Sequence, residues 1–164
     1  MPFSAEHADV LAHFKPPVVS FHFGLPSPDL LARVRSWGSK IISSATTVEE
    51  AQWLASQGVD AVIAQGVEAG GHRGIFITED PCADIDKQIG TFALLPQIVR
   101  AIDIPVIAAG GIADAAGVRA AMALGASAVQ IGTAYMLCPE ATTSKVHRAA
   151  LLGSLIGIDP QVTA

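Results

Sequence analysis

Ala108-Ala109-Gly110-Gly111-Ile112 and Gln130-Ile131-Gly132-Thr133 are the two stretches that decide the predicted fold. Each follows a short apolar run and precedes a helix-like stretch. Glycines at such corners let backbone N–H groups approach a phosphate closely, and the N-terminus of the next helix adds a favourable dipole. Phosphate sites after the last two strands recur in (β/α)8 barrels. The two turns therefore favour a barrel over an open doubly wound sheet.

Working outward from these turns, the same βα pattern extends over most of the chain. The predicted strands are nearly continuous apolar runs, which indicates parallel strands buried on both faces: Val18–Gly24, Lys40–Ala45, Ala61–Gln65, Pro105–Ala109 and Ala128–Gly132. The predicted helices span about 27–37, 91–102, 114–124 and 142–152, with one more that Thr46 or Thr47 caps and Gly58 stops. A complete barrel needs about 250 residues. The chain is thus predicted to be an α/β partial (β/α)8 barrel, with five parallel units in sequential order.

Composition narrows the classes of partner. The chain has 164 residues, 51% of them apolar, and a net charge of −5 without a basic stripe, which argues against a nucleic-acid partner. No apolar run is long enough for a membrane span, and residues 1–17 lack a signal-peptide pattern. Cys82 and Cys138 fit no metal spacing, so no metal is expected. Two unpaired thiols in a cysteine-poor chain suggest the cytoplasm.

A third glycine-rich turn, Gln65-Gly66-Val67-Glu68-Ala69-Gly70-Gly71-His72-Arg73-Gly74, carries the main candidate for chemistry. Histidine accepts a proton readily near neutral pH, and the surrounding glycines leave the imidazole of His72 exposed. The alternative is a histidine that only hydrogen-bonds within its loop. Glu68 is expected to be solvated or structural. His22 ends a strand and is a weaker candidate for the same mouth, whereas no catalytic role is expected for His7, His13 and His147.

The turn Gly66–Gly74 resembles the catalytic loop of nitronate monooxygenases, formerly called 2-nitropropane dioxygenases. Val19–Pro26, Pro105–Ile112 and Gln130–Thr133 are similar to the later strands of that family. The resemblance covers essentially the whole chain, which corresponds to strands four to eight of the family's barrel. It implies one incomplete FMN-binding barrel domain over residues 1–164, with two open sheet edges that self-association into a homo-oligomer would cover.

The resemblance also implies a reaction and a set of residues. FMN is the expected cofactor, and a small nitronate or nitroalkane and O2 are the expected substrates. His72 is the expected catalytic base, which takes the α-proton of a nitroalkane or binds the nitronate. Gln65 is expected near the flavin ring. The FMN phosphate is expected to contact Ala109, Gly110, Gly111, Gly132 and Thr133.

Two other functions stay open at this point. A flavin-dependent enoyl-acyl-carrier-protein reductase shares the barrel and a similar Gly-Gly-His loop, but it uses NAD(P)H. A non-catalytic remnant that binds a phosphate-bearing ligand is an alternative of a different class. The glycine turns do not fit GxGxxG, so the sequence shows no dinucleotide fingerprint of the usual kind.

Overall fold

The computed structural model describes residues 3–153. Its five strands are all parallel and form one sheet in the order β1-β2-β3-β4-β5. The strands are β1 (Val18–Phe21), β2 (Lys40–Ala45), β3 (Ala61–Gln65), β4 (Val106–Ala109) and β5 (Ala128–Gln130). The predicted sequential order of five βα units is therefore confirmed, and the doubly wound order is excluded.

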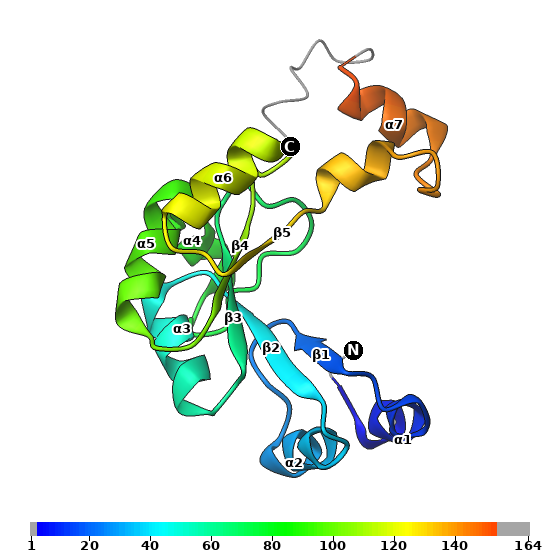
Figure 1. Ribbon diagram of the computed structural model, residues 1–164, viewed down its shortest axis with the longest axis vertical. Coiled ribbons are helices and arrows are strands. Elements are labelled where there is room, and N and C mark those ends of the chain that lie inside the picture. Colours follow the sequence, from blue (N-terminus) through cyan, green and yellow to red (C-terminus); the bar gives the residue numbers. More distant parts are fainter. Residues whose placement is uncertain (1–2, 154–164) are drawn as a thin grey trace.

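Helices cover one side of this sheet. Helices α3 (Val48–Ser56), α5 (Thr91–Ala101) and α6 (Ala115–Ala123) line that side, and α2 (Pro28–Ser36) packs on β2 (Figure 1). Helix α1 (Ala5–Phe14) and helix α7 (Lys145–Leu151) lie near the two ends of the sheet. None of the helices within residues 3–153 is long and apolar enough to cross a membrane.

The hydrophobic core lies between the sheet and these helices. Its largest fully buried apolar side chains come from strands and helices alike: Val34, Ile41, Leu54, Val62, Leu94, Leu95 and Ile98. Burial of one such side chain contributes about 1.5–3 kcal/mol relative to its exposure. Every residue of β3 is buried, as expected for the central strand of a covered parallel sheet.

The edge strands depart from the prediction of burial on both faces. Val18 and Ser20 of β1 are exposed, and so are Ala128 and Gln130 of β5. The cause is the partial barrel, because β1 and β5 each pair with one neighbour only. β1 is also shorter than predicted. It ends at Phe21, and Phe23 follows with a φ of 65°, which extended strands do not adopt.

The helix caps follow the sequence closely at two positions. Thr47 is the N-cap of α3, and its hydroxyl oxygen accepts a hydrogen bond from the Glu50 amide at 3.1 Å. Asp114 caps α6 and accepts from the amide of Gly117 at 2.8 Å. Thr47 rather than Thr46 is thus the N-cap of α3, whereas Thr46 donates hydrogen bonds to the Glu50 side chain.

Four helices within residues 3–153 were not predicted. One is α1, which begins after Ser4, where the Ser4 amide donates to His7 Nδ1 at 3.1 Å in place of the usual glutamate. The segment 66–90, in which no helix was predicted, contains α4 (Pro81–Asp84) and the 3-10 helix η1 (Ile85–Lys87). A second 3-10 helix, η2 (Thr133–Leu137), begins directly after Gly132. With three to five residues each, α4, η1 and η2 have too few turns to produce a clear periodicity.

Candidate functional site

A cavity of about 830 Å³ opens at the carboxyl ends of the strands. The ends of parallel strands meet at one edge of the sheet, so turns that are far apart in sequence come together there. All three glycine-rich turns line this cavity. The structure places at it every residue that the resemblance assigned to the cofactor, namely Gln65, Ala109, Gly110, Gly111, Gly132 and Thr133.

The glycines of the two later turns differ in what surrounds them. Gly110 has a φ of 119°, and a Cβ there would lie 2.7 Å from Thr91 Oγ1 and 2.9 Å from the Ala69 amide nitrogen. Gly110 has to be a glycine because its backbone packs tightly against the start of α5 and against the His72 turn. A Cβ on Gly132 would meet nothing within 4 Å. Gly132 faces open space, which leaves room for a ligand.

The glycine that opens the His72 turn has a packing reason. A Cβ on Gly66 would overlap the backbone and the hydroxyl of Thr91 at the start of α5. Gly70 lies near the turn that follows β5, because a Cβ there would be 3.4 Å from Thr133 Oγ1. The His72 turn thus packs between α5 and the turn that follows β5.

His72 lies at the rim, and its imidazole is not among the groups that line the cavity. The side chain is exposed, and its ring lies edge-on to that of Phe23 with centroids 6.1 Å apart. The backbone carbonyl of His72 is held firmly. It accepts a hydrogen bond from Gln65 Nε2 at 3.0 Å and lies 3.1 Å from His22 Nε2.

Gln65 braces the His72 turn as well as lining the cavity. While its Nε2 donates to the His72 carbonyl, its Oε1 accepts from the Gly74 amide at 2.7 Å. Both ends of this side-chain amide are therefore committed to the turn. His22 follows β1, lines the cavity and supports the same carbonyl, so the weaker candidate of the sequence lies at the mouth.

Arg73 holds the inner part of the turn together. Its guanidinium donates to the carbonyl of Gly66 at 2.7 Å, to that of Ala69 at 2.9 Å and to Gln88 Oε1 at 2.7 Å. Burial lowers the pKa of Arg73, and the opposite charge of Glu68 works against this shift. The fixed fork of donors on arginine suits several acceptors at once. Arg73 was not recognised as a site residue from the sequence.

Glu68 joins the turn to α5. Its carboxylate accepts from the Thr91 amide at 2.8 Å and from the Thr91 hydroxyl at 2.8 Å. Of the two roles expected for Glu68, solvated or structural, these contacts support the structural one. Partial burial raises the pKa of Glu68, but hydrogen bonds from the Thr91 and Glu68 amides and the Thr91 hydroxyl, with the charge of Arg73, outweigh it. The net result is a pKa below the ordinary value of 4.5.

This lowered pKa predicts an acid-dependent contribution to stability. A carboxyl group whose pKa is lower in the folded state stabilises the fold above its unfolded pKa and loses that effect as the pH falls through the folded pKa. We expect wild type to exceed Glu68→Gln in free energy of unfolding at pH 7, and the difference to shrink steadily below about pH 4.5. Urea unfolding at a series of pH values measures it. A difference independent of pH would contradict the prediction.

Helix α7 brings a second group of side chains to the cavity. His147, Ala150 and Leu151 all line it, although no role was expected for His147. No local sequence pattern predicts that these residues lie at the cavity, because their position depends on how the chain runs from β5 to α7. Within residues 3–153, no three or more His, Cys, Asp or Glu side chains are grouped to hold a metal ion. Cys82 is exposed and Cys138 half-buried, and both are free thiols.

Five sequential parallel βα units, with their glycine turns at one cavity, define a partial (β/α)8 barrel protein. A sequence model of the nitronate monooxygenase family matches residues 4–158. The chain belongs to the nitronate monooxygenase family.

Individual relatives of this chain are also nitronate monooxygenases. A nitronate monooxygenase of Paraburkholderia phytofirmans is 52% identical over 85% of this chain and 37% of its own length. One of Pseudomonas aeruginosa is 48% identical, over 88% of this chain and 40% of its own length. The chain thus spans about two-fifths of the length of these relatives.

Two solved structures share the fold of this chain. A nitroalkane oxidase from Streptomyces ansochromogenes superposes with a TM-score of 0.83 at 46% identity, over 88% of this chain and 41% of that one. FabK from Thermotoga maritima gives a TM-score of 0.75 at 36% identity, over 92% of this chain and 44% of that one.

Proposed function

We propose that this chain forms the phosphate-binding part of a single FMN-binding barrel domain that oxidises nitronates or nitroalkanes with O2. The observation that carries the proposal is the convergence of the three glycine turns at one cavity in a chain of this family. The oxidised substrate is a small molecule, in keeping with the size of the cavity.

The residues at the cavity suit the phosphate of FMN. Gly132 faces open space, and Gly110 and Gly111 present backbone in left-handed conformations that keep side chains out of the way. Ala109, Gly110, Gly111, Gly132 and Thr133 would hold the phosphate through backbone N–H groups and the Thr133 hydroxyl. Gln65 would lie toward the flavin ring. When bound, FMN supplies the redox chemistry of the oxidation by O2.

His72 would act on the substrate rather than on the cofactor. Its exposed imidazole takes the α-proton of a neutral nitroalkane, which converts the substrate to its nitronate. Gln65 and His22 hold the backbone carbonyl of His72, so the imidazole projects from a fixed point of the rim. A fixed backbone with an exposed imidazole suits a general base, because a ring nitrogen stays accessible to accept the proton.

Two assays on a chimera test this function. The chimera joins the N-terminal segment of the Paraburkholderia phytofirmans relative to this chain, and wild-type chain alone serves for comparison. We expect the purified chimera to be yellow with bound flavin and to take up O2 with propionate 3-nitronate. We expect no NADH consumption with a crotonyl thioester. A colourless chimera that binds no added FMN would contradict the proposal and favour a non-catalytic remnant.

The enoyl-acyl-carrier-protein reductase is retained as a second candidate. The likeness to FabK supports it, but at a lower identity and TM-score than the nitroalkane oxidase gives. The same pair of assays separates the two functions. Consumption of NADH with the thioester, without O2 uptake on the nitronate, would assign the reductase reaction instead.

A further inference from the structure

Glu50 is a fully buried carboxylate to which the proposed reaction gives no part. It lies in the first turn of α3, and its side chain is 0% exposed. One oxygen, Oε2, accepts from the Thr46 amide at 2.6 Å and from the Thr46 hydroxyl at 2.8 Å. The other, Oε1, accepts from the Phe76 amide at 2.6 Å and the Ile77 amide at 3.1 Å. A buried charge is tolerated only with such partners.

A helix cap explains half of this arrangement. A glutamate three residues after the N-cap commonly reaches back to free amides at the start of the helix. Oε2 of Glu50 does so at Thr46, next to the cap residue Thr47. Oε1 is not needed for capping, and its two donors lie 26 and 27 residues further along the chain. Glu50 therefore joins α3 to the segment that carries His72.

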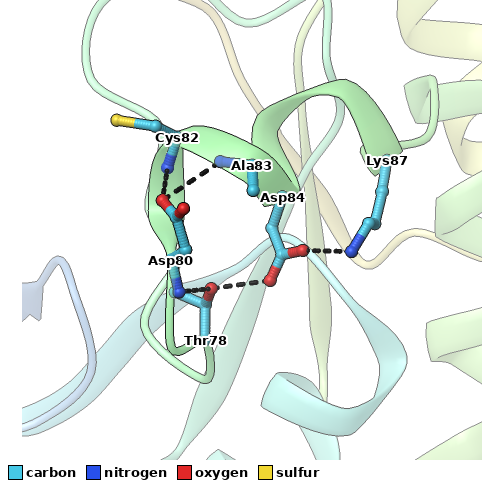
Figure 2. A network of polar contacts seen from close by, with 6 residues as sticks. All are labelled: Thr78, Asp80, Cys82, Ala83, Asp84 and Lys87. Atoms are coloured by element: carbon cyan, nitrogen blue, oxygen red, sulfur yellow. Dashed lines mark hydrogen bonds and ion pairs between the residues drawn. The ribbon is translucent and has the colours of Figure 1, made fainter.

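Phe76 and Ile77, which Glu50 holds, lie between the His72 turn and residues 78–87. The Phe76 ring contacts Trp53 of α3, with centroids 5.3 Å apart, and it packs against Gly24. After Ile77, the side-chain hydrogen bonds of residues 78–87 join that segment to itself (Figure 2). Thr78 and Lys87 both bond to Asp84, and Asp80 accepts from the amides of Cys82 and Ala83.

We propose that Glu50 is a positioning residue that fixes the outer end of the His72 turn against α3. Gln65 holds Gly74 from inside the cavity, and Glu50 holds Phe76 and Ile77 from outside it. Only Ile75 separates these two anchors, and Gln65 also holds the His72 carbonyl, so the backbone from His72 to Ile77 is fixed before any ligand binds. The effect on catalysis rests on the proposed function; the positioning does not.

Hydrogen exchange on the full chain tests the positioning directly. We expect Glu50→Ala to speed exchange of the Phe76 and Ile77 amides by about 10- to 100-fold, the usual effect of losing a hydrogen bond to a charged group. Thr46→Val is the matched control, because it removes one bond on the cap side of Glu50 and leaves Oε1 in place. In that variant these two amides should keep nearly the wild-type rate.

A merely structural role would give a different pattern. The amides of β3 report opening of the whole fold, and we expect them to change less than those of Phe76 and Ile77. Should Glu50→Ala fail to fold, Glu50→Gln keeps the shape and one acceptor, and a smaller, several-fold acceleration at the same two amides is expected. Equal acceleration at β3, or none at Phe76 and Ile77, would overturn the proposal.

Kinetics of the chimera give a second readout. We expect Glu50→Gln to lower kcat on a nitroalkane by about 10-fold or more, because a displacement of about 1 Å in a catalytic group is costly. FMN affinity should stay the same, since Gly132 and Thr133 lie on another turn. An inactive wild-type chimera would count against the proposed function alone, because the exchange experiment still decides the role of Glu50.

Discussion

His72→Asn is expected to slow oxidation of a neutral nitroalkane by about 10²- to 10⁴-fold in the chimera, with FMN still bound. The reason is that asparagine keeps a polar side chain of similar reach but cannot take a proton. The backbone carbonyl at this position, which Gln65 and His22 hold, is the same in both proteins. The turn should therefore keep its place, and the loss should fall on proton transfer.

A second substrate separates a base from a residue that shapes the turn. A pre-formed nitronate is already anionic and needs no proton removed, so His72→Asn should affect its oxidation far less. Steady-state O2 uptake with both substrates measures the ratio. Equal losses on both would leave His72 a binding or structural residue.

Two other histidines serve as controls for this experiment. His13 is an exposed residue of α1 whose Nδ1 lies 2.8 Å from the Asp9 carbonyl, so His13→Asn should change neither substrate. His22 lines the cavity and supports the His72 carbonyl. Its replacement should weaken the turn and reduce oxidation of both substrates alike. Selective loss on the nitroalkane in His22→Asn, but not in His72→Asn, would move the base to His22.

The order of the strands and the position of the glycine turns were predictable from the sequence. Apolar runs such as Ala61–Gln65 alternate with helical stretches, and each turn falls at a carboxyl end. Because parallel strand ends meet at one edge, the shared mouth of Gly110 and Gly132 follows from this order alone. Burial on the two edge strands was not predicted correctly, because β1 and β5 each pair with one neighbour only.

The direction of the His72 ring was not predictable. Glycines around His72 indicated an exposed imidazole, which is correct, but they gave no direction for it. That direction depends on Phe23, a non-glycine residue with a φ of 65°, whose ring lies beside the imidazole. Left-handed backbone at a phenylalanine is uncommon, and no local pattern announces it.

The attachment of the turn was also hidden in the sequence. By its position Glu50 is an acidic residue in the first turn of α3, which favours the helix dipole, and half of its bonds go to Thr46 at the start of that helix. Its other partners, Phe76 and Ile77, are far away in sequence. Contacts of this kind depend on where the chain returns after a long loop, which periodicity does not encode.

The other large effect is expected at the proposed phosphate site, in Gly132→Leu. A Cβ at Gly132 meets nothing within 4 Å, and its φ of −114° lies outside the left-handed region that requires glycine. The protein itself should therefore tolerate the leucine, whereas a phosphate in that space would lose its backbone contacts. We expect FMN affinity of the chimera to fall by about 10- to 100-fold or more, since hydrogen bonds to a charged group contribute about 1.5–3 kcal/mol each. Titration of FMN fluorescence measures this loss.

Gly110→Ala provides the contrast that makes the result interpretable. Its added Cβ would press on Thr91 Oγ1 and on the Ala69 amide, in a backbone conformation with a φ of 119°. Overpacking of this kind costs about 1–3 kcal/mol, so Gly110→Ala should lose FMN together with free energy of unfolding. Gly132→Leu should lose FMN with its urea midpoint unchanged. Gly111 is less suitable for this test, because its φ of 66° would add strain to any substitution. Undiminished FMN binding in Gly132→Leu would place the phosphate elsewhere and leave the open space beside Gly132 without a ligand.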